Sequence, residues 1–403
     1  MRHADIAIVG GGLAGSTAAA MLGRSGLDVV LIDPHAVYPP DFRCEKLDGV
    51  QTGILRRTGL ADAVLRAATP DRESWVARLG RLVEKRPGDQ HGILYDTLVN
   101  AVRAEIPPAL EFICAKVTDV ATGAERQTIT LSGGTALSAR LVVMANGLNS
   151  GLRKALGMGR EELSPCHSIT IGFDIEPVGR PSFDFSSLTY YAERLGGDRM
   201  AYLTLFPVGA AMRANFMVYR DLHDPWLREM RQSPEQTLRS SMPRLSRLTG
   251  ELAVVGPIKI RPADLYVTTG YRRPGIVLVG DAFATSCPAA GTGTGKVFTD
   301  VERLCNVHVP RWLATDGMGA EKIAAFYDDP VKQACDAHSA AKAYHLRSLS
   351  IDRGLAWTAR RCGRFVARLG VGMLRQLHGG LSFASRERPA AARPAAAALR
   401  DSA

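Results

Sequence analysis

Short runs of consecutive apolar residues near the start of the chain predict buried strands. One such run covers residues 6–9 and a second covers 29–32, and an Ala- and Leu-rich segment over 13–24 predicts a helix between them. Strands that are apolar throughout are typical of a parallel sheet covered on both faces. This strand, helix and strand predict a β-α-β unit, so the chain is expected to open with an α/β domain.

The pattern changes at Ser168, where apolar and polar positions begin to alternate. Ile169, Ile171, Phe173 and Ile175 are separated by small or polar residues, which is the period of a half-buried antiparallel strand. Similar segments follow up to about residue 219. The continuously apolar type of strand then returns at residues 276–279. The pattern therefore predicts an antiparallel sheet inserted into the α/β domain.

These patterns predict five parts along the chain. They are a first segment of the α/β domain at 1–160, a sheet insertion at 161–255, a second segment of the α/β domain at 256–330, C-terminal helices at 331–380, and a disordered Ala/Pro/Arg-rich tail at 381–403. Further helices are predicted over 52–65, 94–103, 225–248 and from about 299, and further strands over 112–117, 128–131 and 141–144.

Composition narrows the class of protein. The seven cysteines among 403 residues are scattered without a C-x-x-C pair, which argues against a disulfide framework and a zinc ribbon. The histidines are dispersed, so we expect no metal site. Because neither a signal peptide nor a run of about 18 apolar residues is found, we expect a cytoplasmic protein. The net charge of +10 invites a nucleic-acid or membrane interpretation, but no nucleic-acid-binding motif accompanies it.

A glycine motif follows the first predicted strand and opens the first predicted helix. In the pattern G-x-G-x-x-G, the first glycine permits a tight turn, the second lets a pyrophosphate approach the backbone, and the third lets helix and strand pack closely. The candidate binding residues here are Gly10, Gly12, Leu13, Ala14 and Gly15. The motif predicts dinucleotide binding.

Asp33 ends the second predicted strand, about 20 residues after the glycine motif. An acid in this position accepts hydrogen bonds from a ribose hydroxyl in dinucleotide-binding folds. Asp33 could also merely cap the end of its strand. Both interpretations remain open from the sequence.

A second motif follows the late apolar strand. Asp281, in Gly280-Asp281-Ala282, could accept a hydrogen bond from a sugar-alcohol hydroxyl, and the loop behind it exposes backbone amides to a phosphate or a polar ring edge. The candidate residues of the motif are Gly280, Asp281, Pro288, Gly291, Thr292 and Gly293. A P-loop is not predicted, because Ala290 and Val297 stand where that motif needs glycine and Ser or Thr.

Three motifs in this order resemble the FAD-dependent aromatic hydroxylases, the single-component flavoprotein monooxygenases of the 4-hydroxybenzoate hydroxylase type. They are the glycine motif with Asp33, the segment 145–153, and the second motif extended to Asp300, and the resemblance covers about 1–330. It implies a Rossmann-like FAD-binding domain with an inserted antiparallel-sheet substrate domain and C-terminal helices. In one departure, Asn146 stands where the family usually has Asp.

The resemblance also implies which residues hold FAD. The glycine motif would bind the ADP half, Asp281 the ribityl chain, and the loop 288–293 would lie along the isoalloxazine ring. Arg43 and His91 stand roughly where the family places two further FAD contacts. No catalytic residue is assigned.

By the same resemblance, the expected function is hydroxylation of an aromatic or polycyclic small molecule through a flavin C4a-hydroperoxide, with dioxygen as oxidant. Since only one dinucleotide motif is found, a transiently docked NAD(P)H or a separate reductase would supply the electrons. A flavin-dependent halogenase, or an FAD-dependent reductase or desaturase on the same fold, remains the alternative.

Three further features leave alternatives open. Lys46 could serve halogenation near a flavin or be an exposed lysine paired with Glu45. Tyr190, Tyr191, Tyr202 and Phe206 could roof a substrate or belong to the core. The basic C-terminal segment 355–377 could lie on an anionic membrane and collect a lipophilic substrate, or pack on the core as a helix with a solvated face.

Overall fold

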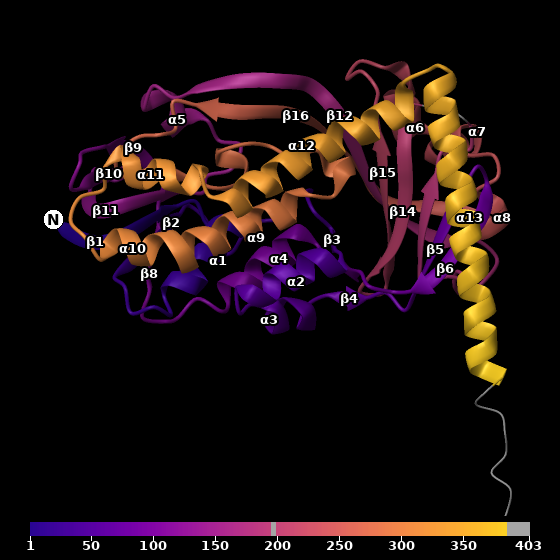
Figure 1. Cartoon of the computed structure of the whole chain (residues 1–403), viewed down its shortest axis with the longest axis horizontal. Coiled ribbons are helices and arrows are strands. Elements are labelled where there is room, and N and C mark those ends of the chain that lie inside the picture. The colour runs from indigo at the N-terminus through magenta and orange to yellow at the C-terminus, as the bar shows by residue number, and fades with distance from the viewer. Residues whose placement is uncertain (195–198, 385–403) are drawn as a thin grey trace, which may run out of the picture.

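Two large sheets organise the computed structural model, which describes residues 1–194 and 199–384 (Figure 1). The strands of the first sheet are β1 (Arg2–Val9), β2 (Val29–Asp33), β8 (Glu111–Cys114), β9 (Val117–Ala121), β10 (Gln127–Leu131), β11 (Ala136–Met144) and β17 (Ile276–Leu278). Those of the second are β5 (Glu73–Arg78), β6 (Arg81–Pro87), β12 (Gly159–Pro177), β13 (Ser187–Tyr191), β14 (Met200–Val208), β15 (Ala211–Val218) and β16 (Leu252–Thr269). A small third sheet contains β3 (Lys46–Leu47), β4 (Thr69–Pro70) and β7 (His91–Gly92).

Helices cover both sheets and connect them. The α-helices of the described residues are α1 (Leu13–Leu22), α2 (Gly49–Arg57), α3 (Ala61–Arg66), α4 (Tyr95–Arg103), α5 (Gly151–Ala155), α6 (Pro225–Gln232), α7 (Pro234–Ser241), α8 (Ser246–Thr249), α9 (Gly293–Arg303), α10 (Val309–Leu313), α11 (Ala320–Tyr327), α12 (Pro330–Ile351) and α13 (Leu355–Ala384). Two 3₁₀ turns, η1 (Gly280–Ala282) and η2 (Pro288–Ala290), and a π-helical turn, η3 (Leu304–His308), accompany them.

The first sheet contains the predicted β-α-β unit. Its order is β8-β2-β1-β11-β10-β9, with β17 also paired to β11, and β1 runs parallel to both β2 and β11. Ile6, Ile8 and Leu31 are fully buried, as continuously apolar strands require. The predicted α/β class with a Rossmann-like domain is confirmed.

The second sheet is mostly antiparallel and has the order β16-β12-β15-β14-β13-β5-β6. On β12, Ile169, Ile171, Phe173 and Ile175 are buried in one apolar cluster with residues of α6 and α7. The small and polar residues between them belong to the opposite face of the strand, which looks toward the first domain. This alternation, predicted from the sequence, gives the second sheet one face in a core and one face free to line a site.

The sheets differ from the predicted division of the chain in two places. Strands β5 and β6 come from residues 73–87, within the predicted first segment, yet β5 pairs with β13 in the second sheet. Strand β16 crosses the predicted boundary at residue 255. We keep the five-part division as a proposal, with β5 and β6 added to the sheet of the insertion.

Several predicted helices have other bounds in the structure. The helix predicted over 52–65 is two helices, because Gly59 between them has a φ of 73°. The one predicted over 225–248 is three, and Pro234 starts the second of them. The helix expected from about 299 already begins at Gly293. Each break lies at a glycine or proline, the residues that end helices by their backbone geometry.

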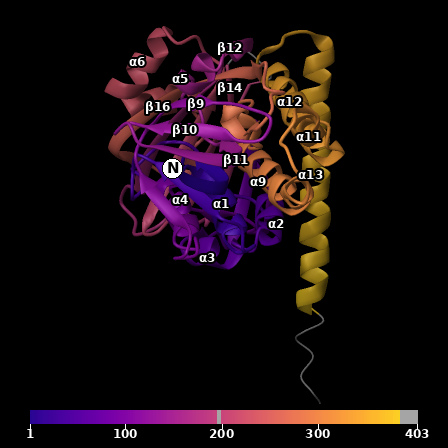
Figure 2. The same cartoon turned by 90° about the vertical axis from the view of Figure 1, so that its left-hand side faces the viewer.

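The C-terminal helices lie on the outside of both layers. Helix α12 runs along the molecule from the first domain to the second sheet, and α13 then descends beside the edge strand β6 (Figures 1 and 2). Since α13 extends to Ala384, the first residues of the predicted tail are helical, and residues 385–403 lie outside the described part. Across the residues that the structure describes, none of the helices carries a stretch both long and apolar enough to cross a membrane.

Candidate active site

Two adjoining cavities mark the candidate site. The glycine-loop cavity, of about 520 Å³, opens where the parallel strands of the first sheet end, and most of its lining comes from the first domain. The sheet cavity, of about 340 Å³, lies between that domain and the second sheet. Both are lined by Leu13, Arg43, Tyr95, Asp281 and Val297. The two cavities therefore adjoin in one crevice region at a domain interface, where ligand sites are common.

The glycine motif closes one end of this crevice. A Cβ on Gly15 would lie 1.8 Å from the carbonyl oxygen of Gly10, so helix α1 can approach β1 only because residue 15 is glycine. Gly10 has a φ of 102°. A Cβ on Gly12 would meet nothing closer than Tyr38, at 3.9 Å, and Gly12 lines the glycine-loop cavity. Gly12 precedes α1 without a side-chain cap, which leaves the first amides of the helix available to an anion.

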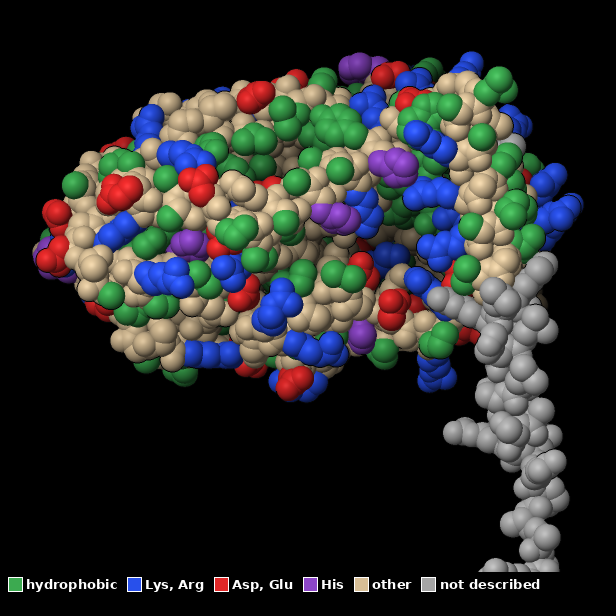
Figure 3. All heavy atoms as spheres, viewed as in Figure 1, with side chains coloured by type: hydrophobic (Ala, Val, Ile, Leu, Met, Phe, Trp, Pro, Cys, Tyr) green, Lys and Arg blue, Asp and Glu red, His purple; other side chains and the backbone are tan. Residues whose placement is uncertain are grey.

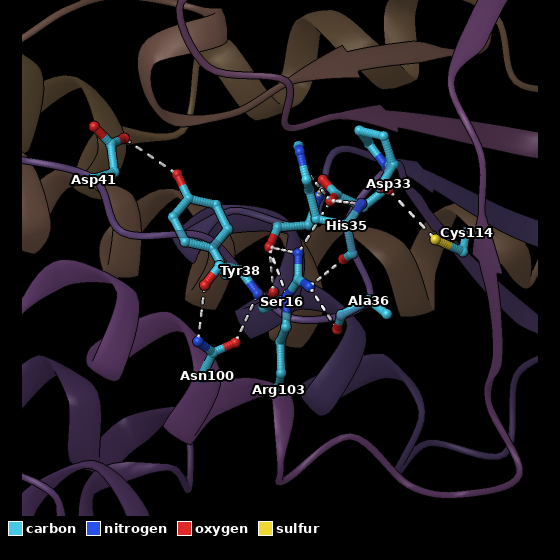
Figure 4. A network of polar contacts seen from close by, with 11 residues as sticks. Ser16, Asp33, His35, Ala36, Tyr38, Asp41, Asn100, Arg103 and Cys114 are labelled. Atoms are coloured by element: carbon cyan, nitrogen blue, oxygen red, sulfur yellow. Dashed lines mark hydrogen bonds and ion pairs between the residues drawn. The ribbon is translucent and has the colours of Figure 1, made fainter.

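Asp33 is bound mainly to backbone groups next to the glycine motif (Figure 4). Its carboxylate accepts hydrogen bonds from the amides of Gly11, at 2.7 Å, and His35, at 2.9 Å. Asp33 also lines the glycine-loop cavity. The carboxylate therefore fixes the turn after β2, and its place at the cavity leaves the predicted contact with a ribose open as a proposal.

Arg103, at the end of α4, is a site residue that the sequence analysis missed. Its guanidinium lies 3.3 Å from the Asp33 carboxylate and donates to the carbonyl oxygens of Gly11, His35 and Ala36 at distances of 2.6 to 3.0 Å (Figure 4). Only 8% of its side chain is exposed. Arg103 thus joins the glycine turn to the turn after β2, a role for which its position at the end of an amphipathic helix gave no signal.

Arg43 and Asp281 meet where the two cavities join. The guanidinium of Arg43 donates to Asp281 Oδ2 at 3.0 Å and to Asp41 Oδ2 at 2.6 Å. It also lies 5.6 Å from the ring centroid of Tyr95. Burial raises the pKa of the Tyr95 phenol, so this hydroxyl stays protonated at physiological pH. The structure therefore brings together two candidate FAD contacts that are 238 positions apart in the sequence.

The loop after Asp281 lines the sheet cavity. Pro288, Gly291 and Gly293 border this cavity. The loop is held from two sides, since Tyr202 donates its hydroxyl to the Ala289 oxygen at 2.6 Å and Gln51 donates to the Gly291 oxygen at 2.9 Å. Helix α9 begins directly behind the loop without a side-chain cap. Its first amides are thus available to a ligand in the crevice.

Four candidate residues stand apart from both sets of lining residues. Gly15 serves packing. Gly280 donates its amide to Asp300 Oδ2 at 3.0 Å, and the Thr292 hydroxyl contacts Ser339 Oγ at 2.7 Å. His91 lies on β7, between β3 and β4. Gly15, Gly280 and Thr292 act on the shape of the crevice, whereas His91 is not carried into the proposed FAD site.

The segment 145–153 supplies another part of the glycine-loop cavity. Asn146, which replaces the usual acid, accepts a hydrogen bond from Arg153 at 3.0 Å and donates to the Asn149 oxygen, also at 3.0 Å. Asn146, Gly147 and Asn149 line the cavity. The amide therefore organises this turn by donating and accepting, which a carboxylate could not do.

The sheet cavity has a charged wall that contradicts one expectation. Glu45 accepts hydrogen bonds from Arg213 at 2.8 and 2.9 Å and from Asn215 at 2.7 Å, and 2% of its side chain is exposed. The expected pair of Glu45 with an exposed Lys46 is wrong, because Arg213 takes the carboxylate and Lys46 is half-buried at the cavity. Of the four aromatic residues considered as a roof, Tyr202 lines the cavity, while Tyr190 and Phe206 are core residues.

The fold and the two adjoining cavities define a class: a protein with a dinucleotide-binding fold in which a second sheet lines the neighbouring cavity. The sequence model of the family described as "FAD binding domain" matches residues 3–307. The 3-demethoxyubiquinol 3-hydroxylase of Escherichia coli (strain K12) is 27% identical over 336 residues, which cover 76% of this chain and 79% of the relative.

Solved structures show the same fold. The p-nitrophenol 4-monooxygenase PnpA from Pseudomonas putida DLL-E4 superposes with a TM-score of 0.72 at 16% identity, over 92% of this chain and 95% of that one. The flavin-dependent brominase Bmp2 superposes with a TM-score of 0.67 at 15% identity, over 96% and 100%. The chain belongs to the FAD-binding domain family of flavoprotein monooxygenases and hydroxylases. It is an FAD-dependent oxidoreductase, and the resemblance to the FAD-dependent aromatic hydroxylases is confirmed.

Proposed function

We propose that this oxidoreductase hydroxylates an aromatic or polycyclic small molecule, with dioxygen as oxidant and NAD(P)H as electron donor. The observation that carries the proposal is that the two cavities adjoin at Arg43 and Asp281, which line both of them. A cofactor lying in the glycine-loop cavity could extend one end into the sheet cavity. There it would meet a substrate enclosed by the second sheet.

The residues at the crevice fit FAD. The uncapped start of α1 and the place of Gly12 in the lining of the glycine-loop cavity suit a pyrophosphate, and Asp33 suits a ribose. Asp281 faces the junction of the cavities, where a ribityl chain would pass, and the amides around Gly291 and Gly293 suit the polar edge of a flavin ring. Bound FAD would supply the redox chemistry and the activation of dioxygen.

The chain's own residues would bind and orient the substrate and exclude water. Phe42, Met217 and Pro288 give the sheet cavity apolar surface for a ring. The fully bonded Glu45 is not a proton acceptor for the substrate, because Arg213 and Asn215 occupy its oxygens. The wall on that side therefore acts as a rigid boundary.

Purified full-length protein tests this proposal. It should retain FAD, and a hydroxylatable aromatic compound should accelerate NADPH or NADH oxidation together with oxygen uptake and a product that has gained one oxygen atom. Without retained FAD, or with FAD but no aromatic-stimulated oxygen uptake, the proposal fails. Flavin that dithionite reduces and NAD(P)H does not would assign the electrons to a separate reductase.

Halogenation is the second candidate, favoured by the shared fold with the brominase Bmp2 and by Lys46 at the sheet cavity. The same assay, repeated with chloride or bromide, separates the two reactions. A halogenated product that forms only with halide would replace hydroxylation as the function. Turnover without dioxygen would instead favour a reductase or desaturase.

We further propose that α13 rests on an anionic membrane surface and gives access to a lipophilic substrate. Lys and Arg side chains gather over α13 and the neighbouring sheet (Figure 3). Arg368 pairs with Glu84 of β6 at 3.3 Å, whereas Arg360, Arg364 and Val366 are exposed. Full-length protein should float with vesicles that contain phosphatidylglycerol and stay behind with phosphatidylcholine alone. Equal behaviour with both vesicles would refute this contact.

A further inference from the structure

Of the four cationic side chains that line the sheet cavity, three form ion pairs with carboxylates. Four cationic side chains border it: Arg43, Lys46, Arg160 and Arg261. The three arginines form ion pairs, Arg43 with Asp281 at 3.0 Å, Arg160 with Asp264 at 2.8 Å, and Arg261 with Asp41 at 2.7 Å. Their charges are therefore neutralised by residues of the protein itself.

The carboxylates that line the cavity also accept hydrogen bonds or form ion pairs within the protein. Glu45 is bound by Arg213 and Asn215, and Asp48 accepts the amide of Gln51 at 2.8 Å as the N-cap of α2. The other two lining carboxylates, Asp264 and Asp281, belong to the arginine pairs. Asp48 therefore differs from the other three carboxylates, because it caps a helix without an ion pair among the described residues, and its charge acts on Lys46.

Lys46 is the exception among the four cations. Its ammonium donates to Gln90 Oε1 at 3.0 Å and lies 5.2 Å from the ring centroid of Phe206. Within the residues that the structure describes, no carboxylate forms an ion pair with it. Lys46 lines the sheet cavity, and a lysine ammonium has three donors, of which Gln90 takes one. Burial lowers the pKa of Lys46 to about 8, and the charges of Asp71 and Asp48 oppose that shift. The amine is therefore still largely charged at neutral pH.

The remaining lining describes what would meet this ammonium. Phe42, Met217 and Pro288 offer apolar contact, and so does Leu148, from the segment 145–153. A flat apolar ring with one anionic oxygen matches both the apolar surface and the spare donors. Ionisation of a phenol also raises the electron density of its ring, which favours attack by an electrophilic oxygen.

We propose that Lys46 is a specificity-determining residue that binds the ionised oxygen of a phenolic substrate in the sheet cavity. This inference rests on the proposed function and adds the residue by which the cavity would prefer a phenolate over a neutral aromatic ring. Lys46 lies outside the glycine-loop cavity, which would hold the ADP half of FAD, so its substitution should leave the retention of FAD by that half unchanged.

Matched probes test the inference on the full-length, FAD-loaded protein at neutral pH. The probes are 4-nitrophenol, which ionises, and 4-nitroanisole, its methyl ether, which does not. Equilibrium dialysis measures the binding of both probes, and the measurement does not itself require bound flavin. We expect the wild type to prefer the phenol, and Lys46→Met to weaken phenol binding by about tenfold or more while ether binding changes less than about twofold.

Two further variants sharpen the test. Lys46→Arg keeps the charge and should retain most of the preference for the phenol. Lys85→Met removes an exposed lysine of the second sheet that does not line the cavity. Its ammonium lies 3.9 Å from the ring centroid of Trp75. This variant should change the binding of neither probe. The FAD spectrum is recorded for every variant, because loss of FAD from the wild type contradicts the proposed function rather than the role of Lys46.

Three results would overturn the inference. The wild type could bind phenol and ether alike, or Lys46→Met could weaken both probes equally, which would give Lys46 a packing role. Alternatively, Lys46→Met could leave the phenol preference intact and lower the affinity of the flavin for sulfite. That result would assign the charge of Lys46 to the flavin ring instead of the substrate.

Discussion

The two cavities that meet at Arg43 differ in the groups that shape them. The glycine-loop cavity depends on backbone geometry: Gly10, Gly12 and Gly15 shape it, and Asp33 is held by amides. The sheet cavity is lined by side chains from several distant segments. The difference shows that the glycine turn of the first cavity is encoded in a short stretch of sequence, whereas the wall of the sheet cavity consists of side chains that only the complete fold assembles.

The largest expected effect tests the backbone side of this comparison. In Gly15→Ala the new Cβ would lie 1.8 Å from the Gly10 oxygen, so α1 must move away from β1. We expect loss of bound FAD or of soluble protein, measured by the flavin to protein ratio. Gly53→Ala, inside α2 with open space around it, should instead be neutral or stabilise the protein by up to about 1 kcal/mol. If Gly15→Ala bound FAD normally, the glycine-loop cavity would not depend on backbone geometry as stated above.

The next effect tests the side-chain wall. Glu45→Leu removes the carboxylate from the buried Arg213, whose remaining partner Asp174 lies at 3.1 Å and is 36% exposed. Breaking a buried ion pair from one side costs about 3–5 kcal/mol, so urea unfolding should show a loss of that size. Because the cost comes from an uncompensated charge, adding Arg213→Met should recover part of it. A loss in the double variant equal to the sum of the two single losses would contradict this account.

A smaller effect is expected when a side chain that binds several backbone carbonyls and one carboxylate is removed. Arg103→Met deletes the donors to the carbonyls of Gly11, His35 and Ala36. We expect a loss of about 2 kcal/mol in unfolding free energy and weaker FAD retention, since charged donors bond more strongly than neutral ones. Arg24→Met, in an exposed pair with Glu105, should change stability by less than about 1 kcal/mol.

The smallest effect sharpens the comparison at the loop between the cavities. Tyr202→Phe removes the hydroxyl that donates to the Ala289 oxygen at 2.6 Å and leaves the ring in place. One neutral hydrogen bond contributes about 1 kcal/mol, so the protein should stay folded. We expect the fluorescence of bound flavin to change and substrate affinity to fall, while FAD affinity stays the same. An unchanged flavin signal would show that Gln51 alone holds the loop.

The extent to which the site could be predicted follows the same division. The glycine spacing after a buried strand predicted the end of the site where a dinucleotide would bind. The alternation of apolar and polar residues on β12 predicted which face of the second sheet packs in a core and which is free. Arg103 gave no signal, because most of its contacts are to carbonyls that any residue carries, and its pairing with Asp33 links positions 70 apart in the sequence. The pairing of β5 with β13 was also missed, because register between strands 113 positions apart depends on tertiary packing rather than on local pattern.

That long-range pairing has a consequence for synthesis of the protein. Strands β5 and β6 leave the ribosome more than a hundred residues before β13, the strand beside which β5 lies, and at about 5–20 residues per second the delay lasts several seconds or more. During this time β5 presents an unpaired edge, which is a template for pairing with another nascent chain. Chains cut short before Ser187 should therefore aggregate, and the yield of intact protein should depend on chaperones that shield this hairpin until its neighbour arrives.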